Sequence, residues 1–449
     1  MRICTLLGLV AALAAGQWLE TTIVLPDSAY PNAVCYNATD NKVYSANYKH
    51  KDVTVIDGAT NQIVATVPAD SGPYALCFNP VSNRVYCANH WSGTVTIIDG
   101  ATDSVITAVP AGERPVFLCC NTVSNKVYCS NENSDNVTII DGATDSVITT
   151  VAAGDRPYYI CHSPVNNRLY CINNTSDDVT VIDGVSDSVV TTFPVGDGCW
   201  AACYNPTGNK VYVGNDQGDS VSVIDCAANT VIATVPAGDA PQGVCYNPID
   251  NRVYCTNYSS NNVTVIDCTA DTAVATVPVC TGPWPILHSP VNNKVYVAGY
   301  SSDSVTVIDG ATNAVLATIG VGDGPSDMCC NPQQNRVYTA DYRGWTISVL
   351  HDSIPSGVEE GVELQASSSK PGPTIVRGVL MLPRDMTETA EVSDRVPRPV
   401  LLDAAGRKVL DLHPGANDVS RLAPGVYFIH QASGVMGDAS STTRVVITD

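Results

Sequence analysis

The feature that most constrains the fold of this chain is a repeat of 42 residues. The tetrapeptide Asn-(Lys/Arg)-(Val/Leu)-Tyr occurs eight times, and a second mark, (Val/Ile)-Ile-Asp, keeps the same 42-residue step until His351 replaces its last Asp. A fixed period of roughly 20–50 residues indicates a repeat architecture, in which each unit buries its apolar face against its neighbours. The Asn of the tetrapeptide stands at Asn41, Asn83, Asn125, Asn167, Asn209, Asn251, Asn293 and Asn335.

Each repeat contains four short β patterns separated by turn residues. In the second copy these runs are Tyr74–Asn79, Arg84–Asn89, Thr94–Asp99 and Ser104–Pro110. They alternate apolar and polar side chains, are rich in β-branched residues and show no helical period of 3.6. A unit of about 40–45 residues with four strands has the size of a propeller blade, so the pattern predicts an all-β propeller.

The two ends of the repeat array predict that the ring is closed. The array opens with a single run, Glu20–Pro26, and ends on a third run, Thr346–His351. The first run would complete the last blade and remove its free sheet edges. Residues 17–352 hold eight repeats of 42 residues. We therefore predict an eight-bladed β-propeller, with a seven-bladed ring as the alternative if one copy is displaced.

The second run of each repeat carries a family resemblance. The segments Tyr44-Ser45-Ala46-Asn47 and Tyr86-Cys87-Ala88-Asn89, together with the following Val-Thr-Val-Ile-Asp-Gly-Ala-Thr pattern, resemble the YVTN family of β-propeller repeats. The resemblance covers about three quarters of the chain. It implies an extracellular or surface propeller of bacteria or archaea, and it says more about fold and location than about chemistry.

The first residues predict export. Arg2 precedes an apolar stretch, Ile3–Ala12, and small residues follow at 12–16, so residues 1–16 are expected to form a secretory signal peptide. No other run approaches 18 apolar residues, and no transmembrane segment is expected in the mature chain.

After Asp352 the repeat stops, and residues 353–373 form a Gly-, Ser-, Pro- and Glu-rich linker. Residues 374–449 alternate in a way that predicts a small antiparallel β-sandwich. The strings Asp403-Ala-Ala-Gly-Arg-Lys-Val and Leu422-Ala-Pro-Gly-Val-Tyr-Phe resemble the C-terminal sorting domain of type IX secretion substrates. That resemblance implies recognition by the secretion machinery and a protein that is secreted or attached to the outer cell surface. An ordinary immunoglobulin-like accessory domain is the alternative.

Charge excludes one class of partner. Lys and Arg total 23 against 44 Asp and Glu, for a formal net charge of −21. The chain therefore lacks the positive electrostatic potential that attracts the phosphates of nucleic acid. No nucleophile elbow, zincin motif or phosphate loop is present.

The 18 cysteines follow the repeat. One position of the first run holds seven of them and one position of the second run holds four, at Cys35, Cys77, Cys119, Cys161, Cys203, Cys245 and Cys329 and at Cys87, Cys129, Cys171 and Cys255. Hairpin pairs such as Cys77 and Cys87 could be bonded, but single members are replaced without their partners, so packing cysteines are expected. A neighbouring register contains Cys120, His162, His288 and Cys330 on separate blades, and no metal site is predicted from it.

Two repeat positions near the start of the first run predict a binding site at the rim of the central funnel. One position carries five carboxylates, namely Glu113, Asp155, Asp197, Asp239 and Asp323, with Ser71 and Thr281 elsewhere. The other carries Tyr74, Tyr158, Trp200 and Trp284, with Asn32 and Gln242. Aromatic faces beside carboxylates suit a sugar or a cation, and a ring of oxygens could hold calcium. The structural alternative is that Gly-Asp forms turns and the rings pack between blades.

Two further positions are expected to be structural. The Asp of the (Val/Ile)-Ile-Asp mark, as at Asp57, should accept backbone N–H groups in an Asx turn, and the Asn that ends the second run, as at Asn47, should cap the following turn.

The sequence favours a non-enzymatic, exported propeller that binds a small ligand, a glycan or a protein partner at the cell surface. A lactonase-like hydrolase with a metal in its funnel and a structural surface-layer component are the alternatives. No cofactor is predicted beyond the possible calcium ion.

Overall fold

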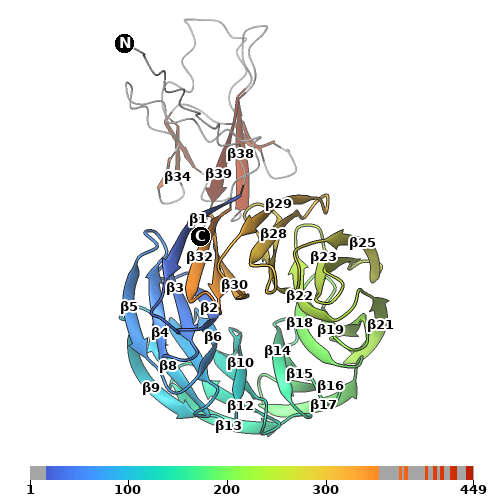
Figure 1. Cartoon of the computed structure of the whole chain (residues 1–449). Helices are drawn as coiled ribbons and strands as arrows, with labels where there is room; N and C mark the ends of the chain where they lie inside the picture. The colour runs from blue at the N-terminus through green and yellow to red at the C-terminus, as the bar shows by residue number, and fades with distance from the viewer. Residues whose placement is uncertain are drawn as a thin grey trace, which may run out of the picture. The chain divides into compact units, whose positions relative to one another are not determined.

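The computed structural model of the chain describes residues 17–352 and seven short strands between residues 374 and 447. Residues 17–352 form eight four-stranded antiparallel sheets, arranged as blades around a common centre (Figure 1). The eight-bladed prediction is confirmed, and the seven-bladed alternative is wrong. The predicted signal peptide, residues 1–16, and the linker, residues 353–373, lie outside the described residues. Among the residues that are described, no helix has the length and apolar character of a membrane span.

In seven of the eight blades the strands run from inner to outer in chain order. The strands of the first four blades are β2 (Pro31–Asn37), β3 (Lys42–Asn47), β4 (Asp52–Asp57) and β5 (Ile63–Pro68); β6 (Pro73–Asn79), β7 (Arg84–Asn89), β8 (Thr94–Asp99) and β9 (Ser104–Pro110); β10 (Pro115–Asn121), β11 (Lys126–Asn131), β12 (Asn136–Asp141) and β13 (Ser146–Ala152); and β14 (Pro157–Ser163), β15 (Arg168–Asn173), β16 (Asp178–Asp183) and β17 (Ser188–Pro194).

The strands of the next three blades are β18 (Cys199–Asn205), β19 (Lys210–Asn215), β20 (Ser220–Asp225) and β21 (Thr230–Pro236); β22 (Pro241–Asn247), β23 (Arg252–Asn257), β24 (Asn262–Asp267) and β25 (Thr272–Pro278); and β26 (Pro283–Ser289), β27 (Lys294–Gly299), β28 (Ser304–Asp309) and β29 (Val315–Gly320). The eighth blade combines β30 (Pro325–Asn331), β31 (Arg336–Asp341) and β32 (Thr346–His351) with β1 (Trp18–Val24) as its outer strand.

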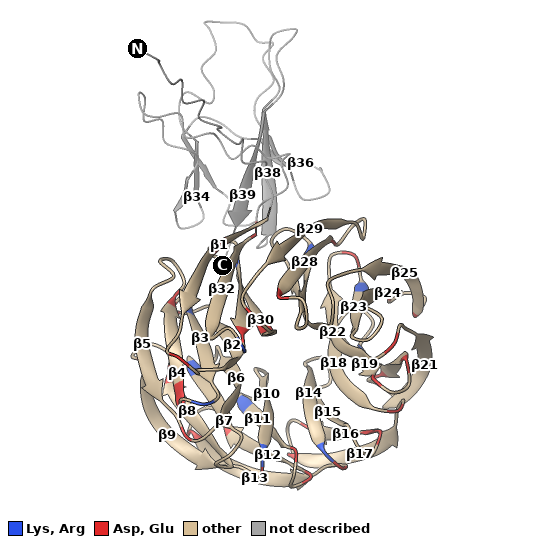
Figure 2. Ribbon diagram, in the orientation of Figure 1, with Lys and Arg blue, Asp and Glu red and all other residues tan. Residues whose placement is uncertain are grey.

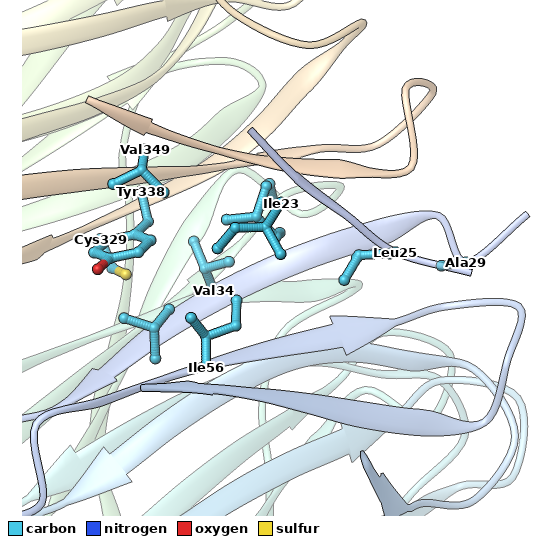
Figure 3. Close-up of a cluster of buried hydrophobic side chains, with 11 residues drawn as sticks. Ile23, Leu25, Ala29, Val34, Ile56, Cys329, Tyr338 and Val349 are labelled. Carbon is cyan, nitrogen blue, oxygen red and sulfur yellow. The ribbon is translucent and has the colours of Figure 1, made fainter. Parts of the chain in front are cut away.

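The ring is closed by β1, as predicted from the unpaired run at the start of the array. This strand pairs antiparallel with β32, from Trp18 opposite His351 to Val24 opposite Thr346. Figure 3 shows the apolar cluster at this junction, where Ile23 lies near Val34, Ile56 and Val349. The cluster buries side chains from the first and the last strand of the propeller together, which makes ring closure favourable through the hydrophobic effect.

The tetrapeptide joins each blade to the next one. The hydroxyl of Tyr44 donates to Asp103 Oδ1 of the next blade at 2.7 Å, and Lys42 Nζ donates to Asp103 Oδ2 at 2.8 Å. Equivalent bonds from a tyrosine hydroxyl join five more pairs of blades at 2.7–3.1 Å, namely Tyr128–Asp187, Tyr170–Asn229, Tyr212–Asp271, Tyr254–Asn313 and Tyr338–Asn61. The hydroxyl of Tyr296 donates to Asp352 Oδ1, directly after β32, at 2.6 Å. All eight tyrosines of the motif are fully buried. The motif therefore recurs because each copy supplies the polar contacts of one blade interface.

The Asn of the tetrapeptide has two structural roles. All eight copies have positive φ, for example 51° at Asn41, a conformation that Asn tolerates better than most residues. The side chains also link neighbouring blades: Asn79 Nδ2 donates to Asn125 Oδ1 at 2.8 Å, and Asn331 Nδ2 donates to Asn41 Oδ1 at 2.9 Å across the ring closure.

Of the two positions expected to be structural, Asp57 forms the predicted Asx turn, whereas the Asn47 side chain bonds to the third strand and does not cap the following turn. Asp57 Oδ1 accepts the backbone N–H groups of Ala59 at 3.0 Å and Thr60 at 2.8 Å, which is an Asx turn. Asn47 Nδ2 donates to Thr54 Oγ1 at 2.8 Å, so this Asn ties the second strand to the third.

The cysteines are packing residues. All 17 cysteines within residues 17–352 are free thiols. In the second blade Cys77 lies opposite Tyr86, whereas Cys87 lies opposite Leu76. Because successive side chains of a strand point to opposite faces, Cys77 and Cys87 lie on different faces of their sheet and cannot bond to each other.

The C-terminal strands form a separate unit, since the chain divides between residues 358 and 359. One antiparallel sheet contains β33 (Thr374–Val376), β34 (Val379–Leu382) and β37 (Gly415–Asp418); the other contains β35 (Val400–Leu402), β36 (Lys408–Asp411), β38 (Gly425–Gln431) and β39 (Ser441–Ile447). The way in which these two sheets pack lies outside the described residues, so the β-sandwich and its likeness to a sorting domain remain predictions.

Candidate functional site

A cavity of about 230 Å³ lies at the centre of the ring. Residues from the inner strands of all eight blades line it, so the site exists only when the ring is closed. Its volume is below the roughly 300–1,000 Å³ of drug-sized sites, which indicates a small ligand.

A bulge at the start of each inner strand directs side chains into this cavity. The pairing of β6 with β7 shifts between Pro73 and Ala75, which leaves Tyr74 as the extra residue, and the other inner strands show the same irregularity at or just after this position. A bulge bends a strand and changes the direction of the extra side chain. Tyr74 and its equivalents consequently border the cavity.

The structure brings the four predicted aromatic residues together. Tyr74, Tyr158, Trp200 and Trp284 all line the cavity and are half-buried. The hydroxyls of Tyr74 and Tyr158 are 3.2 Å apart, and the ring centroids of Tyr158 and Trp200 are separated by 4.6 Å. Burial raises the pKa of both phenols, so they are neutral at physiological pH.

The five predicted carboxylates lie elsewhere. Glu113, Asp155, Asp197, Asp239 and Asp323 are exposed on the loops that precede the inner strands, and none of them lines the central cavity. Their backbones hold the loops in place.

Contacts of three of these residues illustrate their structural roles, two through the backbone and one through the carboxylate. The N–H of Asp155 donates to Ser176 Oγ at 2.9 Å, and that of Asp239 donates to Ser260 Oγ at 2.9 Å. The Asp323 carboxylate accepts from Arg343 Nε at 2.8 Å. A part for these carboxylates in ligand binding remains a prediction.

Sequence reasoning missed the carboxyl group that does line the cavity, Asp327 on β30. Among the eight inner strands, Asp327 is the only Asp, Glu, Lys or Arg. Figure 2 shows an acidic segment on β30 beside the centre of the ring. Asp327 Oδ2 accepts the N–H of Val34 at 2.9 Å and Oδ1 accepts that of Met328 at 2.8 Å.

The environment of Asp327 makes it unusual. Asp327 is partly buried in the cavity wall, and this burial raises its pKa to about 7, despite the two backbone N–H groups that favour its ionised form. Perturbed carboxyl groups beside a cavity are candidates for function. A signal was available in the repeat, because the same position in the other blades holds Ala33, Ala75, Phe117, Tyr159, Ala201, Gly243 and Pro285.

A second missed position lies beside the cavity wall, at the residue after the second strand of each blade. It holds Tyr48, His90, Glu132, Asn174, Asp216, Tyr258, Tyr300 and Tyr342. The ring of His90 stacks on that of Tyr74 at 5.2 Å, and the rings of Tyr300 and Trp284 are 5.8 Å apart. Hydrogen bonding to His90, and then to Arg156, lowers the pKa of Glu132 to about 2. This position therefore supplies aromatic and polar side chains, such as His90, Asp216 and Tyr300, that contact residues of the cavity wall.

The calcium hypothesis needs several oxygen ligands at one place. Within the described parts of the chain, no three His, Cys, Asp or Glu side chains gather in an arrangement that could hold a metal ion. Of the described residues that line the cavity, Asp327 alone carries a carboxyl group, which does not fit the six to eight oxygen ligands of calcium.

Eight four-stranded blades around one small cavity define a closed β-propeller with a central ligand-sized site. The family model for the YNCE-like beta-propeller matches residues 4–290, and the chain belongs to that family.

Solved structures show the same fold at low sequence identity. A chain from the hydrazine synthase of Kuenenia stuttgartiensis matches with a TM-score of 0.54 and 18% identity, over 74% of this chain and 98% of the other. Sqt1 of Saccharomyces cerevisiae matches with a TM-score of 0.65 and 10% identity, over 76% of this chain and 100% of the other. No curated protein matches the sequence.

Proposed function

We propose that this protein is a non-catalytic binding propeller that holds a small ligand in its central cavity. The carrying observation is that aromatic residues from four blades converge on one cavity that also contains a partly buried carboxyl group. A few polar groups among apolar walls are typical of small-molecule sites. The absence of any grouped metal ligands within the described residues gives no support to the lactonase-like alternative.

The proposal includes the location predicted from the ends of the chain. An apolar stretch after Arg2 and a C-terminal segment that resembles a type IX sorting domain support a protein that is secreted or attached to the outer surface. Expression in a bacterium with this secretion system should give extracellular protein whose N-terminus begins near Ala15 or Gln17. Retention of residues 1–16 on intracellular protein would contradict the proposed location.

A ligand screen tests the binding function. Thermal unfolding should be followed with a library of sugars, amines, organic acids and nucleosides, because a ligand that binds only the folded state raises the melting temperature. The variant with Trp200→Ala and Trp284→Ala should lose the shift. Trp91→Ala is the matched control, since Trp91 is 53% exposed and lies outside the central cavity. An equal shift in the double variant, or greater loss in the Trp91 control, would contradict binding in this cavity.

A further inference from the structure

Some polar side chains of the cavity already donate hydrogen bonds to the protein, and others can still accept one from a ligand. Asn32 Nδ2 donates to the carbonyl of Tyr74 at 2.7 Å, and Gln242 Nε2 donates to Asp216 Oδ1 at 2.9 Å. The hydroxyl of Ser326 lies 3.2–3.3 Å from the carbonyls of Pro31, Asn32 and Ala340. One N–H of each amide and the Ser326 hydroxyl are thus directed at the protein, and the amide oxygens and the Asp327 carboxyl group can accept hydrogen bonds from a ligand.

The charge in the cavity is also one-sided. Of the described residues that line it, none is Lys or Arg, and Asp327 is the only acid. Its two backbone donors leave carboxylate lone pairs free, because each oxygen has more than one acceptor site. A partly buried carboxylate without a cationic partner is unfavourable, so a cation in the cavity would stabilise it.

The aromatic walls complete this arrangement. Tyr74, Tyr158, Trp200 and Trp284 come from four different blades and border one space. A cation is attracted to the face of an aromatic ring, with Trp the strongest partner, and alkyl groups on the cation add apolar contact.

We propose that the central cavity binds a small organic ammonium ion, with its alkyl groups against the aromatic rings and its charge compensated by Asp327. This inference rests on the proposed binding function and names its ligand class. Asp327 is the group that distinguishes an ammonium ion from a neutral molecule of the same shape.

Protonation gives a second readout. The titratable groups that face Asp327 are the thiols of Cys35 on β2 and Cys329 on β30 and the phenol of Tyr159 on β14, and burial raises the pKa of all three. They are therefore neutral near pH 7. The other packed strands, β26 and β31, add no titratable side chain to the cavity wall. Because burial raises the pKa of Asp327 to about 7, affinity for a cation should increase between pH 6 and pH 8 as this carboxyl group ionises.

The test compares choline with 3,3-dimethylbutan-1-ol, its neutral analogue of nearly the same shape, by isothermal titration calorimetry of the full chain. At pH 8 we expect choline to bind about tenfold more tightly or better, because cation–π attraction and the carboxylate act on choline alone. Lowering the pH to 6 should weaken choline binding and leave the neutral analogue unaffected. Both comparisons use the natural protein and so do not depend on the folding of a variant.

Two variants locate the charge. Asp327→Asn should reduce the preference for choline to about twofold or less, whereas Asp27→Asn, which changes an exposed carboxylate outside the cavity, should leave it intact. Equal binding of choline and its neutral analogue would overturn the ammonium assignment. Binding of a neutral ligand in the cavity without any binding of choline would overturn it too, while leaving the proposed function standing; an empty cavity with every ligand would remove both.

Discussion

The hydroxyl of Tyr338, in the last blade, donates to Asn61 Oδ1, in the first blade, at 2.7 Å. The two residues are 277 positions apart in the chain, and the bond is buried at the junction that closes the ring. It repeats the contact that Tyr44 makes with Asp103 one blade further on. One motif therefore supplies both the interfaces between consecutive blades and the closure of the ring.

Removing this hydroxyl should destabilise the closed ring. We expect Tyr338→Phe to lower the free energy of unfolding by about 1–2 kcal/mol, because the buried Asn61 amide loses its partner. Urea denaturation followed by circular dichroism measures the change. Tyr258→Phe is the control, since its hydroxyl makes only an exposed contact with Ser301 at 3.4 Å. A smaller loss for Tyr338→Phe than for the control would contradict the structural role of the motif.

The buried Asp341 carboxyl group should lower the free energy of unfolding at neutral pH. It occupies the position that Asn47 holds in the first blade, it is fully buried, and burial raises its pKa to about 6 although three hydroxyls donate to it. The folded protein therefore binds a proton more tightly than the unfolded chain, and stability falls as the pH rises from about 4 to 6.

Asp341→Asn should remove this cost. The amide can donate to Ser348, as Asn47 donates to Thr54. We expect a gain on the order of 1–2 kcal/mol at pH 7.5 and none near pH 4, measured by denaturation at both values. A variant that is less stable than the natural protein at pH 7.5 would show that the carboxylate is favourable.

Glu132 should have the opposite pH dependence. Hydrogen bonds from His90 and Arg156 lower its pKa to about 2, below that of the unfolded chain. Its contribution is thus present above about pH 4.5 and is lost as the pH falls toward 2. The natural protein should be more stable than Glu132→Gln at pH 7, and the two should converge near pH 2. A difference that stays constant over this range would mean that the charge of Glu132 contributes nothing.

The thiols should be reduced and slow to react. Of the 17 cysteines within residues 17–352, ten are buried and the rest are only partly accessible. Burial raises the pKa of thiols such as Cys87 and Cys129, which keeps them in the unreactive protonated form. Alkylation followed by mass spectrometry should label few of them in the native protein and all 17 in denaturant without reductant. Thiols blocked until a reductant is added would instead indicate disulfides.

Much of the propeller could be predicted because the repeat imposes the same contacts in each blade. The strands Arg84–Asn89 and Thr94–Asp99 lie where the pattern places them, and Thr346–His351 ends the array as expected. The closing strand begins earlier than predicted, at Trp18, because the ring of Trp18 stacks on that of His351 at 4.4 Å.

The site could be predicted only in part. The repeat shows that five carboxylates share one level, but it does not show that their side chains are exposed outside the cavity while the backbone N–H groups of Asp155 and Asp239 bond within the loops. Asp327 could not be predicted from residues that the repeats share, because only the last repeat has an acid at this position. Asp327 differs from the residues at the equivalent position of the other seven repeats. A difference of this kind gives one side of a nearly symmetric cavity its own chemistry.

The central claim, that the cavity is a binding site, is tested most directly by a crystal structure of the protein with the tightest ligand from the thermal screen. We predict ligand density at the centre of the ring, in contact with Trp200 and Trp284 and within hydrogen-bonding distance of Asp327. Ligand bound on the outer blades or on the loops, with the central cavity empty, would contradict the account.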